Sequence, residues 1–190
     1  MAGFGYVGNY FWTHYFFQVL GASYTMESHR LNGIPLVMYL MTHAYFNFYH
    51  AISNIVLRKT QTSLSKSPAW VRWTAMAIVV FVLSYSTAFM ETLTIAHYPY
   101  YTFVDRSRMY SVGSLFYAIY FFVSFPMFFR MDEEPSKKKW SAWNAVLDGL
   151  AAAMIVTILL DIWRISFGGI NVHNPEGLQA EAAGLPWMSY

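Results

Sequence analysis

Long apolar stretches separated by short polar connectors run through most of this sequence. A helix that crosses a membrane needs about 20 mostly apolar residues, because the hydrocarbon core of a bilayer is about 30 Å thick. Residues 34–57, 70–96, 110–129 and 143–167 satisfy this requirement, and residues 8–24 form a shorter and more polar fifth stretch. None of the five alternates with the period of two that indicates a strand. The pattern therefore predicts an all-α fold, a polytopic membrane helix bundle with about five transmembrane helices.

Composition supports this division and narrows the function. Only 12% of the residues are charged, against about 25% in a typical globular domain, so too few groups are present to solvate a water-exposed surface. The net charge of +2 is too small to indicate a nucleic-acid partner, and the absence of cysteine excludes disulfides and thiolate chemistry. We therefore expect one integral-membrane domain over residues 1–190 with the lipid bilayer around it.

Polar residues recur along one face of two predicted helices. They are spaced by 4, 3 and 4 in residues 34–57 and by 3, 4 and 3 in residues 70–96, which returns each set to a single helical face. A polar group in hydrocarbon costs free energy unless it is paired, so stripes on several helices predict a shared interior pocket. The alternative is hydrogen bonding between helices, which we favour for the Asn, Ser and Thr members. The stripes are His43, Asn47, His50 and Asn54, and Ser84, Thr87, Glu91 and Thr94.

The histidines do not form a metal-binding pattern. His43 and His50 share a face but lie seven residues apart, about 10 Å along the helix axis, so they cannot bind one ion together. The sequence has no HxxxH or HExxH pair, which argues against a zinc enzyme and against a membrane hydroxylase or desaturase. No metal or cofactor is expected. Asp161 and Arg164, at i and i+3, are interpreted as a structural ion pair near the membrane surface.

Aromatic residues make up 20% of the chain and crowd several predicted helices. Most are expected to serve packing and lipid contact, but a pocket walled by aromatic faces can also stabilise a carbocation. The crowded positions are Phe16, Phe17, Tyr45, Phe46, Phe48, Tyr49, Phe116, Tyr117, Tyr120, Phe121 and Phe122.

Several long runs resemble the cycloeucalenol cycloisomerase (cyclopropyl sterol isomerase) family. The most specific is LFYAIYFFVSFPMFFRMDE at residues 115–133, and others are YFWTHYFF at 10–17 and VLGASYT at 19–25. Shorter matches are ETL at 91–93, PYY at 99–101, FVDR at 103–106, DIWR at 161–164 and GLPW at 184–187. The resemblance extends from about Tyr10 to the end of the chain. Family members carry further hydrophobic sequence ahead of the YFWTH motif, so this chain is interpreted as a domain that lacks those N-terminal helices.

The resemblance implies a reaction and a compartment. The 9β,19-cyclopropane ring of a 4α-methyl sterol would be opened to give a Δ8 sterol, converting cycloeucalenol to obtusifoliol. The expected membrane is that of the endoplasmic reticulum, or the plasma membrane in a bacterium, and the expected partner is the sterol itself. No cofactor is needed, because the isomerisation involves no redox change.

This chemistry requires an acid, stabilisation of a tertiary cation and a base. A carboxylic acid buried away from water can hold its proton at neutral pH, so we expect Glu91 to be the acid and His43 the partner that receives or relays a proton. Asp105 is the second candidate acid, although Arg106 and Arg108 nearby favour a structural role or one in anchoring the sterol 3-hydroxyl. His14 is a weaker relay candidate. The expected substrate-binding residues are Tyr117, Tyr120, Phe121, Trp12, Asn47, His50 and Thr87.

Three other functions are considered. A sterol Δ8–Δ7 isomerase uses the same sequence of protonation and deprotonation in a five-helix bundle. A non-catalytic sterol-binding or scaffold protein would need the pocket but not the acid. A transporter or channel is disfavoured, because the sequence has no inverted repeat and no pair of Gly/Pro-broken helices.

Overall fold

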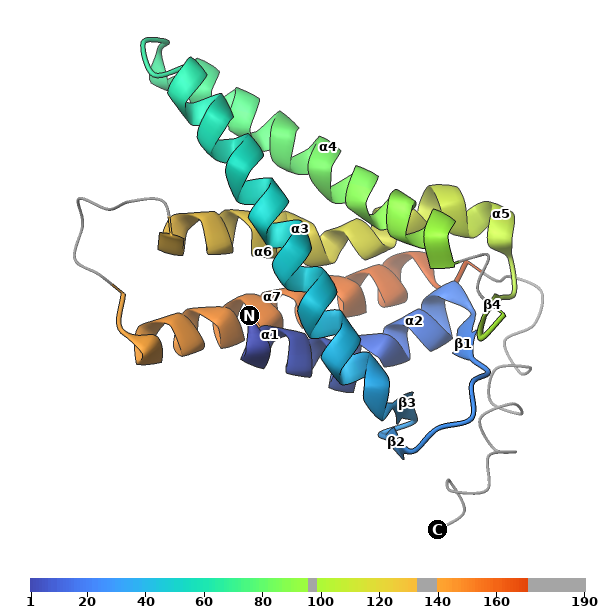
Figure 1. Ribbon diagram of the computed structural model, residues 1–190. Coiled ribbons are helices and arrows are strands. Elements are labelled where there is room, and N and C mark those ends of the chain that lie inside the picture. Colours follow the sequence, from blue (N-terminus) through green and yellow to red (C-terminus); the bar gives the residue numbers. More distant parts are fainter. Residues whose placement is uncertain (96–98, 133–139, 171–190) are drawn as a thin grey trace.

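The fold is a bundle of long helices with two short β-ribbons at one end (Figure 1). The computed structural model describes residues 1–95, 99–132 and 140–170. The charged connector 133–139 and the GLPW motif of the C-terminal tail, on which part of the sequence interpretation fell, lie outside the described residues.

The first helical stretch consists of α1 (Ala2–Val7), a π-helical segment η1 (Gly8–Trp12) and α2 (Thr13–Leu20). It begins earlier and ends earlier than the predicted range of 8–24. The end is set by Gly21, whose φ of +62° lies in the left-handed region that favours glycine. A Cβ atom there would also lie 3.0 Å from the side chain of Val104. Helix α2 therefore stops at Leu20, and the chain continues as a strand.

The other four predicted helices are present with shifted ends. They are α3 (Leu36–Ser63), α4 (Ala69–Ile95), α7 (Ala142–Phe167), and a continuous run made of α5 (Arg106–Arg108), η2 (Met109–Gly113) and α6 (Ser114–Asp132). The last run starts before the predicted residue 110, because the Asp105 side chain accepts a hydrogen bond from the backbone N–H of Arg108 at 2.9 Å and so caps the helix.

The connectors after α2 and after α4 contain short antiparallel strands, which the sequence pattern did not predict. Strand β1 (Ala22–Tyr24) pairs with β4 (Tyr101–Phe103), and β2 (Arg30–Leu31) pairs with β3 (Ile34–Pro35). The β1–β4 ribbon ties the chain that leaves α2 to the chain that follows α4. It lies at the end of the bundle opposite the α3–α4 turn (Figure 1).

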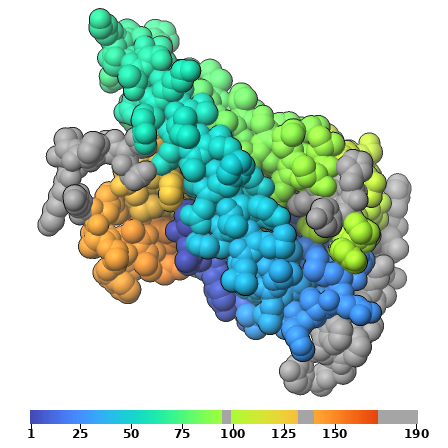
Figure 2. Space-filling model, viewed as in Figure 1, coloured from blue at the N-terminus to red at the C-terminus, as the bar shows by residue number. Residues whose placement is uncertain are grey.

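Helix α6 is the central helix. In the most apolar 18 residues of its helical run, 61% of the residues are buried. The corresponding fractions are 22% for α7 and 11% for α4, so these two helices present most of their side chains outward. It packs against α4, α7 and α3. Helices α3 and α4 cover one face, and the turn between them projects beyond the rest (Figure 2). Large apolar side chains such as Trp73 and Ile78 on α4 and Ile158 on α7 are exposed, as expected for helices that face lipid.

Within the described residues, three helical stretches are long and apolar enough to cross a membrane: Ala69–Thr94, Arg106–Met131 and Ala142–Phe167. The mainly helical fold is thus confirmed, and the span count that length and composition support is three. Helix α3 is long enough, at 28 residues, but its polar stripe lowers its hydrophobicity. The first helical stretch is shorter and interrupted by polar residues, as its sequence indicated.

Candidate functional site

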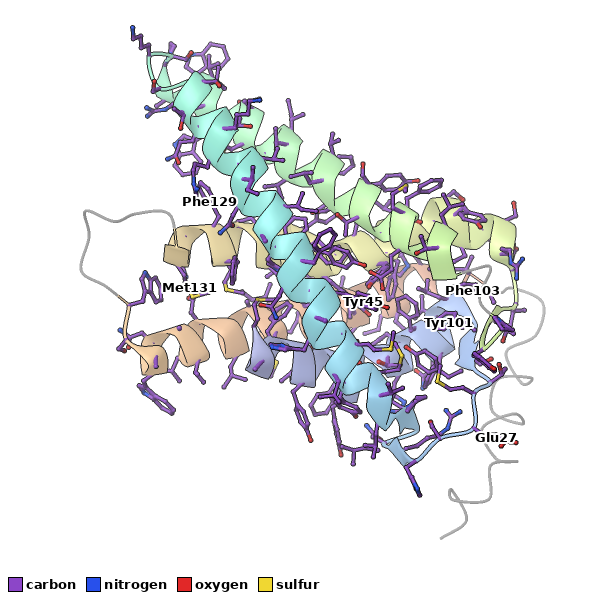
Figure 3. All side chains as sticks on the ribbon, viewed as in Figure 1. Glu27, Tyr45, Tyr101, Phe103, Phe129 and Met131 are labelled. Atoms are coloured by element: carbon purple, nitrogen blue, oxygen red, sulfur yellow. The ribbon has the colours of Figure 1, made fainter. Side chains whose placement is uncertain are left out.

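A cavity of about 490 Å³ lies between the first helical stretch, α3, α4, α6 and the β1–β4 ribbon. This volume is within the range of about 300–1,000 Å³ that is usual for small-molecule pockets. Seven tyrosines contribute to its wall: Tyr24, Tyr45, Tyr49, Tyr100, Tyr101, Tyr117 and Tyr120. Figure 3 labels two of them, Tyr45 on α3 and Tyr101 on β4 at the end of the bundle.

Glu91 is the one acidic or basic side chain among the described residues that line the cavity. It comes from α4, and the phenol groups of Tyr49 on α3 and Tyr117 on α6 lie close enough to interact with it electrostatically. Its Oε2 atom is shielded from solvent and has no hydrogen-bond partner among the described residues. The cavity therefore combines one carboxyl group, two phenols beside it and a free carboxyl oxygen.

The π-helical segment places Trp12 and Asn9 in the cavity wall. A π turn widens the helix by one residue and is frequently found at functional sites. Gly8, within this segment, lies under the indole of Trp12, since a Cβ atom on Gly8 would be 2.8 Å from two ring carbons. Glycine at this position leaves the space that the indole occupies. The indole Nε1 then donates a hydrogen bond to Thr157 Oγ1 on α7 at 2.9 Å.

Aromatic rings lie edge to face along the wall beside Glu91. The ring of Tyr117 is 5.0 Å from that of Phe16 and 4.9 Å from that of Tyr120, both nearly perpendicular. The ring of Tyr120 is 4.9 Å from that of Trp12. Aromatic faces attract cations within about 6 Å of the ring centroid. The wall can thus stabilise positive charge that develops within the cavity.

The β1–β4 ribbon closes one end of the cavity. The rings of Tyr24 and Tyr101 meet there at 4.8 Å, nearly perpendicular to each other. Burial raises the pKa of the Tyr101 phenol well above its ordinary value, so this group stays neutral. Arg30 holds the loop that follows β1, because its guanidinium donates to the backbone oxygens of Tyr24, Met26 and Gly33. This end of the cavity is therefore held by hydrogen bonds between connectors.

The structure brings together four of the residues predicted from the sequence to be catalytic or to bind substrate. Glu91, Tyr117, Tyr120 and Trp12 all line the cavity. Phe121 lies just behind it, fully buried, with its ring 5.4 Å from that of Tyr117. These residues come from the first helical stretch, α4 and α6, which the sequence pattern treated as separate spans.

The polar stripe of α3 does not line the cavity. His43 and Asn47 are exposed, and Asn47 donates to the backbone oxygen of His43 at 2.7 Å. His50, further along, is buried and its Nε2 lies 2.9 Å from Ser124 Oγ on α6. The stripe faces α6 only over its second half, because α3 crosses the bundle obliquely (Figure 1). His43 and Glu91 are therefore not brought together.

The remaining predicted residues have other environments. Thr87 is half-buried on α4 but is not a lining residue, and His14 contacts the ring of Phe17 at 5.8 Å. Asp105 caps α5 and lies outside the cavity wall. Asp161 forms the ion pair with Arg164 that the sequence predicted, at 2.8 Å, and also accepts a hydrogen bond from Tyr15. Among the described residues, no group of three or more His, Cys, Asp or Glu side chains is arranged to hold a metal ion.

Comparison with known proteins gives one informative match. No family model matches the chain, and no solved structure matches it. A protein of Arabidopsis thaliana named cycloeucalenol cycloisomerase is 54% identical over 186 residues, which cover 98% of this chain. The chain belongs to the cycloeucalenol cycloisomerase family. It spans 66% of that relative's length, just under two thirds.

For this member of the cycloeucalenol cycloisomerase family, sequence reasoning placed the polar stripe of α3 in the pocket, and it missed the methionines and Thr42 on the face that lines the cavity. That face carries Met38, Met41, Thr42, Tyr45 and Tyr49. Their spacing of 3, 1, 3 and 4 is a helical stripe as regular as the polar one. The signal was present, but a stripe of methionine and tyrosine is hard to distinguish from a lipid-facing surface.

Proposed function

We propose that this chain is a sterol isomerase that opens the 9β,19-cyclopropane ring of a 4α-methyl sterol, converting cycloeucalenol to obtusifoliol. One observation carries the proposal: a single carboxyl group, Glu91, faces an aromatic cavity of sterol-compatible size in a chain of this family. The Arabidopsis relative is named as a cycloisomerase of cycloeucalenol.

Glu91 is assigned the role of the acid. Its carboxyl proton would pass to C19 of the cyclopropane as the C9–C19 bond breaks, so that C19 becomes a methyl group and C9 a tertiary cation. The hydroxyls of Tyr49 and Tyr117 would donate hydrogen bonds to the carboxylate that remains. Such bonds stabilise the anion as it forms and lower the barrier to proton transfer.

The cation at C9 would be stabilised by the aromatic wall. Rings from Trp12, Tyr117 and Tyr120 present electron-rich faces and edges within one cluster. An aromatic ring attracts a carbocation without forming a covalent adduct, unlike a nucleophilic side chain. The wall thus favours the intermediate without trapping it.

The reaction ends when the C8 proton leaves and the electrons of its bond form the C8=C9 double bond. We assign the acceptance of this proton to the Glu91 carboxylate, directly or through the hydroxyl of Tyr49 or Tyr117. Glu91 is then returned to its acid form, so no external reductant, oxidant or base is consumed. His43 has no part in this scheme, since it lies outside the cavity.

The membrane arrangement is part of the proposal. Alongside the three apolar helices, α3 and the first helical stretch would also cross the bilayer, giving five spans. Their polar side chains would be tolerated where they face the bundle interior, as Asn9 and His50 do. The membrane proposed is that of the endoplasmic reticulum, with the sterol entering from the bilayer.

Turnover in heavy water tests the chemistry. The protein, reconstituted in lipid nanodiscs in D₂O, would be supplied with cycloeucalenol, and the sterols analysed by mass spectrometry and NMR. We expect a Δ8 product with one deuterium in the C19 methyl group, delivered by the exchangeable proton of the acid. Unchanged cycloeucalenol that nevertheless binds would favour a non-catalytic sterol-binding protein. Conversion of a Δ8 sterol to a Δ7 sterol, without ring opening, would favour the Δ8–Δ7 isomerase.

A further inference from the structure

The cavity wall contains a second polar group, formed by Asn9 and Thr42. Thr42 Oγ1 on α3 donates to Asn9 Oδ1 at 3.1 Å. The Asn9 amide in turn donates to the backbone oxygen of Gly5 at 3.0 Å, which fixes the orientation of the amide. Both residues line the cavity, and Asn9 is only 4% exposed. A buried side-chain pair held in one orientation is pre-organised to bind a polar group of a ligand.

The pair has hydrogen-bonding capacity that these contacts do not use. An asparagine amide has two N–H groups, and the bond to Gly5 occupies one. The Thr42 hydroxyl donates its proton to Asn9 and keeps its lone pairs as acceptors. The pair can therefore donate to, and accept from, a single hydroxyl group. A hydroxyl is the one ligand group that matches both functions with one oxygen atom.

Two other polar groups in the wall use their hydroxyls in bonds to the backbone. The Thr94 hydroxyl donates to the backbone oxygen of Glu91, and the Tyr120 hydroxyl donates to that of Trp12. Tyr49 and Tyr117 lie near the Glu91 carboxyl, and their phenols interact with it electrostatically. Asn9 and Thr42 thus form a polar site distinct from the carboxyl group.

The two polar sites are separated along α3. Thr42 and Tyr49 lie on the same face, seven residues apart, which corresponds to about 10 Å along the axis at 1.5 Å per residue. Side chains on a helix lean toward its N-terminus, so the phenol of Tyr49 reaches back toward Thr42 and shortens this distance. A rigid fused-ring ligand with a hydroxyl on its terminal ring can contact one site with the hydroxyl while a neighbouring ring faces the other.

We propose that Asn9 and Thr42 bind the C3 hydroxyl of the sterol and act as positioning residues that place the cyclopropane ring at Glu91. This deepens the proposed function and rests on it for the identity of the reacting ring. It assigns the anchoring role to the cavity wall instead of Asp105, which caps a helix outside the wall. The Asn9–Thr42 pair would select ligands that carry a free hydroxyl at the end nearest the first helical stretch.

Hydroxyl-dependent binding tests the proposal separately from turnover. The 190-residue chain in lipid nanodiscs would be titrated with cycloeucalenol and with its 3-deoxy analogue, and the turnover of each would be measured in parallel. Thr42→Val removes the hydroxyl but keeps the shape, and Thr42→Ser restores the hydroxyl. Thr74→Val makes the same change on the exposed face of α4 and serves as the matched control.

We expect the wild type, Thr42→Ser and Thr74→Val to bind the 3-hydroxy sterol at least about tenfold more tightly than the 3-deoxy analogue, as for loss of one or two hydrogen bonds. Thr42→Val should reduce this ratio to within about threefold, chiefly by weakening binding of the hydroxylated sterol. A ratio that survives in Thr42→Val, or that is absent from the wild type, would overturn the proposal. If discrimination follows the hydroxyl of residue 42 but no sterol is isomerised, the anchor stands and the proposed reaction fails.

Discussion

Trp12 and Thr157 join the first helical stretch to the last helix. The indole Nε1 donates to Thr157 Oγ1 at 2.9 Å, and the indole itself is 1% exposed. One face of Trp12 thereby belongs to the cavity wall while its polar atom is fixed to α7. The position of a cavity residue thus depends on a helix that does not line the cavity.

Thr157→Val should destabilise the protein without a change in its cavity-lining residues. The substitution removes the acceptor and leaves a buried indole N–H unpaired, at a cost of about 0.5–2 kcal/mol. The free energy of unfolding in detergent, measured against Thr74→Val on an exposed surface, would detect it. Equal stability of the two variants would show that the hydrogen bond contributes little.

Removal of a phenol hydroxyl beside Glu91 should slow the chemical step. Tyr117→Phe and Tyr49→Phe keep the ring but remove a donor to the carboxylate that forms in the reaction. We expect kcat to fall by about 10- to 100-fold in each, with a smaller change in KM. Tyr85→Phe provides the control, because the Tyr85 hydroxyl bonds to the Tyr110 backbone and is absent from the cavity wall. An unchanged kcat in both cavity variants would remove the phenols from the mechanism.

Substitution of His43, on the polar stripe of α3, should leave turnover nearly unchanged. His43 is exposed and is not a lining residue, although the sequence made it the expected partner of Glu91. His43→Gln is therefore expected to keep turnover within about twofold of the wild type, as for most exposed substitutions. Turnover reduced by a hundredfold, in a protein that remains folded and binds sterol, would restore His43 to the mechanism.

The helices could be predicted from the sequence because their signal is local. Apolar stretches of sufficient length identified all five helical regions, and only the ends differed. The first ended early because Gly21 adopts a left-handed conformation, and the fourth began early because Asp105 caps it. Both signals are visible in the sequence, but each depends on the conformation of a single residue.

The cavity could be predicted only in part because it depends on how helices cross. Of the polar stripe of α4, Glu91 and Thr94 line the cavity, whereas Thr87 does not. The stripe of α3 was equally regular, yet α3 presents the face with Tyr49 to the cavity and leaves His43 outside. The β1–β4 ribbon was missed for a related reason, since strands of two or three residues carry too little periodicity to be recognised.

Expression of the wild-type chain and of Glu91→Gln in a host that makes no cyclopropyl sterols tests whether Glu91 is the acid that opens the ring. Cycloeucalenol would be supplied, and the sterols would be identified by mass spectrometry and by the high-field NMR signals of the cyclopropane methylene. We expect the wild type to convert cycloeucalenol to a Δ8 sterol, whereas Glu91→Gln should be folded, inserted in the membrane and inactive. Glutamine keeps the shape of the side chain but has no carboxyl proton to give. Ring opening by Glu91→Gln at a rate near that of the wild type would contradict the assignment of Glu91 as the acid.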